Sequence, residues 1–126
     1  KLTNIKFLST DAREVVKTIP LSSVSIFHVY FPDPWFKKKH LRRRLVSAGF
    51  IQWMHERLIP GGFLEIATDN FDYSVAIREE IATAKLPWTR SRESVNERFI
   101  DQTVKTLFET KYEEQGRPLY YFELQR

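Results

Sequence analysis

Residues 24–31 constrain the fold of this chain more than any other stretch, because their sequence, VSIFHVYF, is an almost unbroken run of apolar, β-branched and aromatic residues. Such a run is typical of a strand that is buried on both faces, as in a parallel sheet covered by helices. Parallel strands need a crossover connection, which is usually a helix. The rest of the chain should therefore alternate strands with helices.

Apolar spacing elsewhere predicts this alternation. Strands are expected at residues 4–10, 63–68, 88–94 and 119–124, and helices at 13–19, 40–58, 73–81 and from about 104 to 116. The long helix rests on an apolar stripe made of Leu41, Leu45, Ala48, Ile51, Met54 and Leu58. Pro60, Gly61 and Gly62 should end it. We expect a single α/β domain with a mostly parallel sheet.

Three acids follow predicted strands or lie close to their ends: Asp11, Asp33 and Asp69. In parallel α/β sheets, ligands bind at the carboxyl ends of the strands. Each acid alone could be a helix cap or a turn former, but three at one edge predict a pocket. No glycine follows the first predicted strand, as a glycine-rich phosphate or nucleotide loop would require. Either this fold binds its ligand differently, or the chain begins partway through a domain.

Positive charge is concentrated in one segment. The chain has 20 Lys and Arg against 16 Asp and Glu, and six of the basic residues lie within eight positions: Lys37, Lys38, Lys39, Arg42, Arg43 and Arg44. Outside this segment the chain is slightly acidic. A localised basic patch predicts a polyanionic partner, although a merely solvated basic face is the alternative.

Other function classes find no support in the sequence. There is no cysteine, so disulfides and thiolate metal sites are excluded. His28, His40 and His55 have no metal-ligand spacing with nearby acids, and we assign no metal. No apolar run approaches the ~20 residues that span a membrane. We expect a cytoplasmic protein with no membrane partner. Its oligomeric state, monomer or homodimer, stays open.

Residues 31–45, FPDPWFKKKHLRRRL, closely resemble the signature of the tRNA (guanine-N7)-methyltransferase family in its bacterial, single-subunit form. Further similarities are a strand ending at Asp11, LIPGGFLEIATDN at 58–70 and ETKYEEQGRPL at 109–119, so the resemblance runs from about residue 4 to the end. Two residues depart from the family pattern. Phe36 stands where members often have proline or histidine, and Tyr112 where phenylalanine is commoner.

The resemblance implies a Rossmann-like class I fold that uses S-adenosylmethionine (SAM). Aligned to that fold, residues 1–126 begin at about the third strand. We therefore expect the C-terminal part of a methyltransferase domain, without the first two strands and the glycine-rich loop, and inactive alone. The implied reaction transfers the methyl group of SAM to N7 of a tRNA guanine, by family habit at position 46 in the variable loop.

Guanine N7 carries a free lone pair, so its methylation needs positioning more than a general base. A carboxylate could hold the guanine through N1–H and the exocyclic amine, and could stabilise the positive charge that develops on the ring. Asp33 is the first candidate for this catalytic role, because Pro32 and Pro34 restrict the backbone on either side of it.

The resemblance extends to other site residues. It implies SAM contacts for Asp11 and Asp33. It implies substrate contacts for Lys37, Asp69, Thr110, Lys111, Tyr112 and Glu113. We expect Lys38, Lys39, Arg42, Arg43 and Arg44 to contact the RNA backbone from the first turns of the long helix.

Trp35 could stack on a base, but packing under the turn is the favoured interpretation. Two other functions stay open. One is a non-catalytic RNA-binding module, and the other is a SAM methyltransferase with a different substrate, which would not need six clustered charges.

Overall fold

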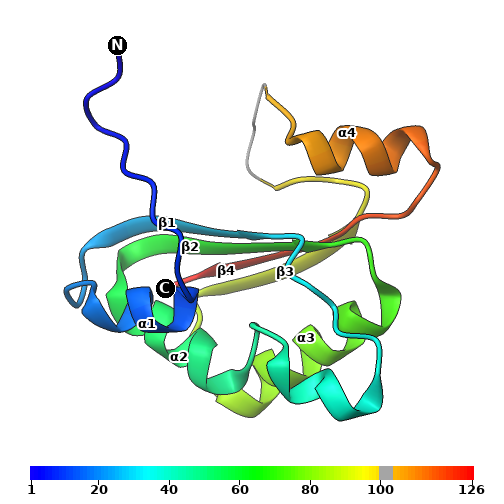
Figure 1. Cartoon of the computed structure of the whole chain (residues 1–126). Helices are drawn as coiled ribbons and strands as arrows, with labels where there is room; N and C mark the ends of the chain where they lie inside the picture. Colours follow the sequence, from blue (N-terminus) through cyan, green and yellow to red (C-terminus); the bar gives the residue numbers. More distant parts are fainter. Residues whose placement is uncertain (100–103) are drawn as a thin grey trace.

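The computed structural model describes residues 1–99 and 104–126 as a four-stranded sheet with three α-helices on one face and a fourth α-helix on the other (Figure 1). The strands are β1 (Val24–Tyr30), β2 (Leu58–Thr68), β3 (Arg90–Val95) and β4 (Tyr120–Gln125), in the spatial order β1-β2-β4-β3. The helices are α1 (Ala12–Thr18), the 3₁₀ helix η1 (Lys38–Arg43), α2 (Ala48–Arg57), α3 (Phe71–Ala84) and α4 (Leu107–Glu114).

The sheet is mixed, so the prediction of a mostly parallel sheet is wrong. β1 pairs with β2 in parallel, whereas β4 is antiparallel to both β2 and β3. The reason lies in the connection from β3 to β4, which starts and ends at the same end of the sheet. The amide of Asn96 donates to the carbonyl of Leu119 (2.7 Å), so no crossover takes place between these strands.

The hydrophobic core lies between the sheet and α1, α2 and α3. Alternate residues of β2 and β4 face these helices, as the two-residue period of a strand requires. The most buried residues of this core are Ile51, Met54, Leu58, Leu64, Ile66, Tyr73, Ile77 and Leu124. None of the helices in residues 1–99 and 104–126 is long and apolar enough to cross a membrane.

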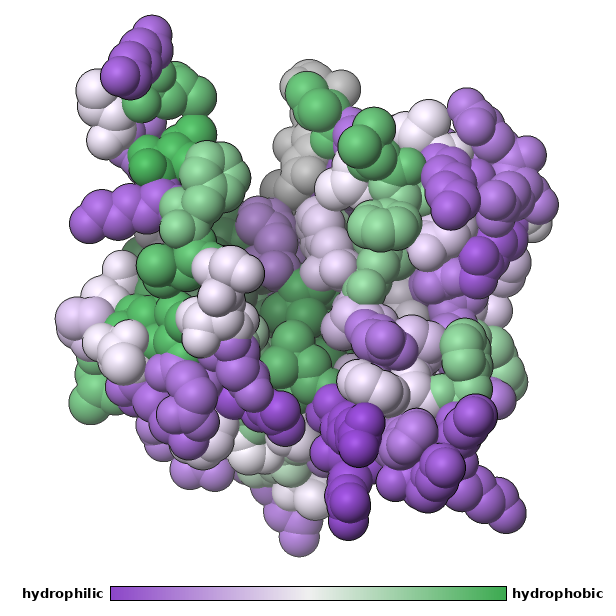
Figure 2. All heavy atoms as spheres, in the orientation of Figure 1, coloured by the Kyte–Doolittle hydropathy of each residue, from purple (hydrophilic) through white to green (hydrophobic). Residues whose placement is uncertain are grey.

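Residues 4–10 do not form the predicted strand. The segment runs away from the sheet (Figures 1 and 2). Phe7, within this segment, is 92% exposed. A strand needs a neighbour to take its backbone hydrogen bonds, and no described residues pair with this segment.

The predicted helix at 40–58 is two helices. The backbone is extended at Arg44 and again at Ser47, whose hydroxyl accepts a hydrogen bond from the amide of Phe50 (3.2 Å) and caps α2. The apolar stripe holds only in its second half, since Leu41 is 40% exposed. The basic residues therefore lie on η1 and at its two ends, and not at the N-terminus of a long helix, where they would oppose the helix dipole.

The strand predicted at 24–31 is confirmed as β1, but it is not buried on both faces. Phe27 and Val29 pack on the core, whereas Ile26 and His28 are exposed on the face away from α1 and α2. β1 is an edge strand of this sheet, and no helix among the described residues covers that part of its outer face.

The other predicted elements are confirmed with shifted ends: α1, α3, α4, β3 and β4. β2 starts earlier than predicted, directly after α2, and the register with β1 shifts between Val24 and Ile26. The Pro60-Gly61-Gly62 turn causes this shift inside the strand. Gly61 has φ +82°, and a Cβ on Gly62 would come within 2.8 Å of the carbonyl oxygen of Ser25.

Candidate functional site

The carboxyl ends of β1 and β2 lie side by side and carry the motif residues. The amide of Phe31 donates to the carbonyl of Ala67 (2.8 Å), so the turn after β1 starts next to the end of β2. Two residues of this turn, Phe31 (φ 52°) and Trp35 (φ 47°), adopt the left-handed conformation that is unfavourable for bulky side chains. Strained backbone of this kind clusters at functional sites.

Asp33 lies at the exposed tip of this turn. Its Oδ1 accepts a hydrogen bond from the amide of Trp35 (3.0 Å), which fixes the side-chain direction. Its Oδ2 has no hydrogen-bond partner within residues 1–99 and 104–126. The turn therefore holds a carboxylate with one oxygen available to a ligand.

Trp35 packs against its own segment. Its ring meets that of His40 edge-on (5.6 Å between centroids), and the guanidinium of Arg43 lies 5.1 Å from its centroid. The side chain is half-buried. These contacts favour packing over base stacking for this tryptophan.

The basic segment divides into two groups. Lys37, Lys38, Lys39, Arg42 and Arg43 are exposed. Arg44 is half-buried, donates to the carbonyl of Pro34 (2.5 Å) and lies over the ring of Tyr73 (4.8 Å). Arg44 therefore ties the PDPW turn to α3, and the other five basic side chains face solvent.

A second group of predicted residues comes together around Asp69, which follows β2. The Asp69 carboxylate forms an ion pair with Arg117, whose guanidinium also lies over the ring of Tyr112 (4.3 Å). The Tyr112 ring in turn meets the ring of Phe31 edge-on (5.4 Å). The structure thus brings Asp69 and Tyr112 to the start of the Asp33 turn.

The remaining predicted residues of α4 are exposed. The hydroxyl of Thr110 donates to the carbonyl of Thr106 (3.2 Å), and Glu113 forms an ion pair with Lys105 (2.7 Å). Lys111 is also exposed, with no ion-pair partner in the described parts of the chain.

A buried polar network, which the sequence did not predict, holds α4 against the sheet. Glu109 is fully buried, and its Oε1 accepts from the amide of Thr106 (2.9 Å) to complete a capping box. Its Oε2 accepts from the hydroxyl of Tyr121 (2.8 Å) and lies 3.2 Å from Nε of Arg98. The spacing of Thr106 and Glu109 was a signal for the cap, but nothing in the sequence pointed to Arg98.

The same network reaches the end of β1. Nη2 of Arg98 donates to the hydroxyl of Tyr30 (3.2 Å), which in turn donates to the carboxylate of Glu65. Burial, followed by the hydrogen bond to Glu65, raises the pKa of Tyr30 to about 12. Since Tyr30 is three residues before Asp33, Arg98 links the base of the Asp33 turn to the first turn of α4.

Asp11 is the N-cap of α1. Its carboxylate accepts a hydrogen bond from the backbone amide of Arg13 (2.9 Å) and forms an ion pair with the guanidinium of the same residue (2.9 Å). Hydrogen bonds from the side chain and backbone of Arg13 hold the pKa of Asp11 below its ordinary value. The structure does not bring Asp11 into contact with Asp33 or Asp69.

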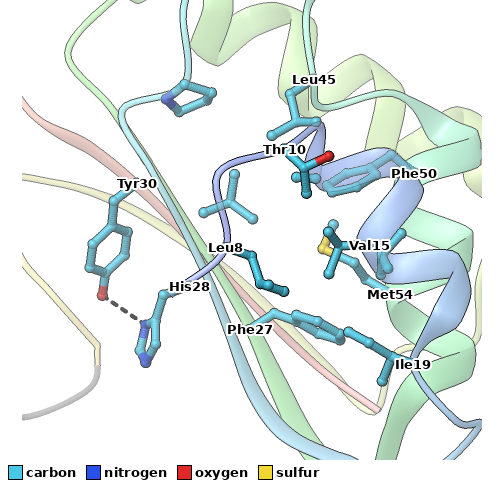
Figure 3. A pocket seen from close by; sticks show the side chains of 14 residues that line it. Leu8, Thr10, Val15, Ile19, Phe27, His28, Tyr30, Leu45, Phe50 and Met54 are labelled. Atoms are coloured by element: carbon cyan, nitrogen blue, oxygen red, sulfur yellow. Dashed lines mark hydrogen bonds between the residues drawn. The ribbon is translucent and has the colours of Figure 1, made fainter. Parts of the chain in front are cut away.

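A cavity of about 400 Å³ lies between α1, β1 and α2. Leu8, Val15, Phe27, Leu45, Phe50 and Met54 line it, whereas His28 and Tyr30 point to the other side of the sheet (Figure 3). Ala12 and Pro32, the neighbours of Asp11 and Asp33, also line the cavity. An apolar space of this size suits the adenosine part of SAM. The lining residues offer no cationic partner for the carboxylate of its methionine part.

Comparison with known proteins agrees with this architecture. A crystal structure of a SAM-dependent methyltransferase from Archaeoglobus fulgidus matches 94% of this chain and 66% of its own length, with a TM-score of 0.59 and 9% identity. The likeness is one of fold, and it identifies the mixed sheet and its helices as a Rossmann-like methyltransferase fold.

Curated relatives are similar over nearly the whole chain. A tRNA (guanine-N(7)-)-methyltransferase from Rubrobacter xylanophilus is 34% identical over 125 residues, which are 99% of this chain and 56% of that protein. One from Polaromonas naphthalenivorans is 45% identical over 86 residues, which are 68% of this chain and 35% of that protein. The chain spans about half the length of the curated relatives it matches. A protein-family model described as "Putative methyltransferase" matches residues 1–122, and the chain therefore belongs to this methyltransferase family.

Proposed function

We propose that this chain forms the substrate-binding part of a cytoplasmic tRNA (guanine-N7)-methyltransferase that modifies guanine 46 in the variable loop of tRNA. The observation that carries the proposal is the arrangement at one edge of the sheet. There, the fixed carboxylate of Asp33 is followed within a few residues by five exposed cations. The names of the relatives from Rubrobacter and Polaromonas support the same activity.

SAM would supply an electrophilic methyl group, and the described residues would hold and orient the nucleophile. Guanine N7 needs no proton removed before it attacks. The protein's contribution is therefore to keep the base at the correct distance and angle, which accounts for much of the rate in reactions of this kind. A rigid turn is suited to this task, because a misplacement of 1 Å can reduce the rate by ~10²-fold.

Asp33 is the proposed catalytic residue. Methyl transfer leaves positive charge on the purine ring, and a nearby carboxylate stabilises that charge as it develops. The hydrogen bond from the Trp35 amide holds Oδ1, while Oδ2 of this exposed residue has no hydrogen-bond partner among the described residues and is proposed to accept from the guanine. Asp11 and Asp33, whose neighbours Ala12 and Pro32 line the apolar cavity, are the residues proposed to contact the cofactor.

The exposed basic side chains are proposed to bind tRNA phosphates. Lys38, Lys39, Arg42 and Arg43 lie on η1, and Lys37 precedes them next to the Asp33 turn. Each phosphate that they neutralise releases counterions, so binding should weaken with salt by ~0.7–0.9 log units per contact for each tenfold rise in salt. Four to five contacts predict a log–log slope of about −3 to −4.5.

The test is the identity of the product. The protein, as its own gene encodes it, is incubated with SAM carrying a labelled methyl group and unmodified tRNA, and the tRNA is digested to nucleosides. We expect label in 7-methylguanosine, from a fragment that contains the variable loop. Label in another methylated nucleoside, or in a small-molecule acceptor, would contradict the proposal.

A non-catalytic RNA-binding module is the second candidate. It is favoured by a cavity whose lining suits only part of SAM. This candidate predicts tRNA binding with the same salt dependence but no labelled nucleoside.

A further inference from the structure

The ion pair between Arg117 and Asp69 has an unusual setting. The Arg117 guanidinium meets the Asp69 carboxylate with an N–H group while its plane lies over the aromatic ring of Tyr112, 4.3 Å from the ring centroid. A planar group is thus held by a carboxylate at its edge and by an aromatic ring at its face.

Guanine presents the same two features. Its N1–H and exocyclic N2 amine form a pair of donors on one edge, which a single carboxylate can accept together, as it accepts from a guanidinium. Its π-face stacks on aromatic side chains. Adenine has an acceptor at N1, so its corresponding edge would be repelled by a carboxylate.

The two partners of Arg117 are held more firmly than Arg117 itself. The Asp69 side chain is 12% exposed, and the Arg117 side chain is 44% exposed. The Tyr112 ring is supported by Phe31 (5.4 Å) and stacked with Phe108 (5.8 Å, 27° between planes). Asp69 and Tyr112 therefore resemble a preformed subsite, and Arg117 is its more exposed occupant.

Arg117 can leave without disturbing the fold. Its backbone amide donates to the carbonyl of Tyr112 (2.9 Å), so the main chain stays in place while the side chain rotates. Once displaced, the guanidinium remains beside the subsite, where a phosphate of the bound nucleotide is a suitable new partner.

We propose that Arg117 occupies the substrate contacts expected at Asp69 and Tyr112 when no substrate is bound, as an internal mimic of the base. The inference rests on the proposed function, since it takes the acceptor to be guanine. It adds a competing side chain, and it assigns the N1–H and N2 edge of guanine to Asp69, which leaves Asp33 the stabilisation of the positive charge on the ring. Guanine must displace Arg117 in order to bind, and other bases lack the donor pair that would let them do so.

The test is nucleoside binding, measured by calorimetry or NMR titration of the chain with guanosine, inosine and adenosine. Replacing Arg117 with alanine removes the internal competitor but leaves the subsite intact. To bind, guanosine must break an exposed ion pair and a cation–π contact of Arg117. The free energies of these two contacts together lower the affinity for guanosine about three- to thirtyfold. The Arg117→Ala variant should therefore bind guanosine about three- to thirtyfold more tightly than the wild type.

Two further variants test the recognition itself. Asp69→Asn should abolish the preference for guanosine over inosine, which lacks the N2 amine. Tyr112→Ala should weaken both nucleosides alike, because it removes stacking. Arg78→Ala is the matched control, since it opens a comparable exposed ion pair with Glu93 and should leave nucleoside binding unchanged.

Unchanged or weaker guanosine binding by Arg117→Ala would overturn the proposal. If that variant does not fold, Arg117→Gln removes the charge with a smaller change in volume and carries the same expectation. Failure here can be told apart from failure of the proposed function. If the wild type forms 7-methylguanosine but Arg117→Ala does not bind guanosine more tightly, only the mimic is refuted. If Arg117→Ala binds guanosine more tightly but no 7-methylguanosine forms, the subsite stands and methyl transfer fails.

Discussion

The attachment of α4 to the sheet can be tested by replacing Glu109 with glutamine. The substitution keeps the size of the side chain and the capping box with Thr106, because glutamine also serves at this capping position. It removes the charge that faces Arg98 at 3.2 Å, where the two side chains are only 1% and 11% exposed. Its main effect is therefore to leave the Arg98 guanidinium buried without its carboxylate partner.

The expected loss follows from these contacts. Removing one partner of a buried ion pair costs about 3–5 kcal/mol. Arg98 keeps its hydrogen bond to Tyr30 and some solvent contact, so the lower end, about 3 kcal/mol, applies here. Urea denaturation followed by circular dichroism measures the free energy of unfolding. Hydrogen exchange of the Leu107–Glu114 amides shows whether the loss is localised in α4.

Glu113→Gln is the matched control on the same helix. It removes the same charge from an ion pair with Lys105 whose side chains are 43% and 52% exposed. Exposed pairs contribute about 0–1 kcal/mol, so this variant should be nearly as stable as the wild type. Equal losses in the two variants, or faster exchange of α4 amides in both, would refute the conclusion that the buried network holds α4.

Three further predictions concern other parts of the structure. Arg42→Ala and Arg43→Ala should each flatten the log–log salt slope of tRNA binding by about 0.7–0.9. Arg44→Ala should instead lower the free energy of unfolding and leave the slope unchanged, since Arg44 contacts Pro34 and Tyr73. The Tyr30 pKa of about 12 lies above its ordinary value of 10.0, so the folded state keeps this proton when the unfolded state has lost it. The corresponding stability is present below pH 10 and is lost as the pH rises from 10 towards 12, and alkaline denaturation of Tyr30→Phe should show a smaller loss over that range. Gly62→Ala should destabilise the fold by about 1–3 kcal/mol in thermal or urea unfolding, because a Cβ there would lie 2.8 Å from the carbonyl of Ser25. Gly49→Ala, which meets nothing within 4 Å in α2, should not destabilise it.

The elements that the sequence predicted well are those whose pattern reflects their burial. β4 and α3 carry apolar residues at the period of their own structure, and these residues lie in the core, whereas the continuous apolar run of β1 predicted the strand but not its exposed face. Residues 4–10 have the composition of a strand, yet a strand also depends on a neighbour that pattern reasoning cannot supply. The stripe from Leu41 to Leu58 was continuous in sequence, but the cap at Ser47 broke it, because local hydrogen bonding by a serine competes with the helix.

The candidate site was predictable where a motif names the residue and its neighbours fix it. Asp33, Asp69 and Tyr112 were expected, and the last two come together at the start of the Asp33 turn. The roles of Arg98, Glu109 and Arg117 were not predictable, since each depends on a contact between residues far apart in the chain. The Arg44 contact with Pro34 likewise separates it from the other basic residues, although all six look alike in the sequence.

The central claim is that Asp33 acts on the guanine while the basic residues hold the tRNA. The most direct measurement compares wild type and Asp33→Ala in two assays on the same preparation: formation of 7-methylguanosine in tRNA, and tRNA affinity. We predict that turnover falls by at least about a hundredfold, as expected when a group that stabilises transition-state charge is removed, while tRNA affinity is unchanged. Near-normal turnover in Asp33→Ala, or a loss of turnover that only follows a loss of tRNA binding, would contradict the account.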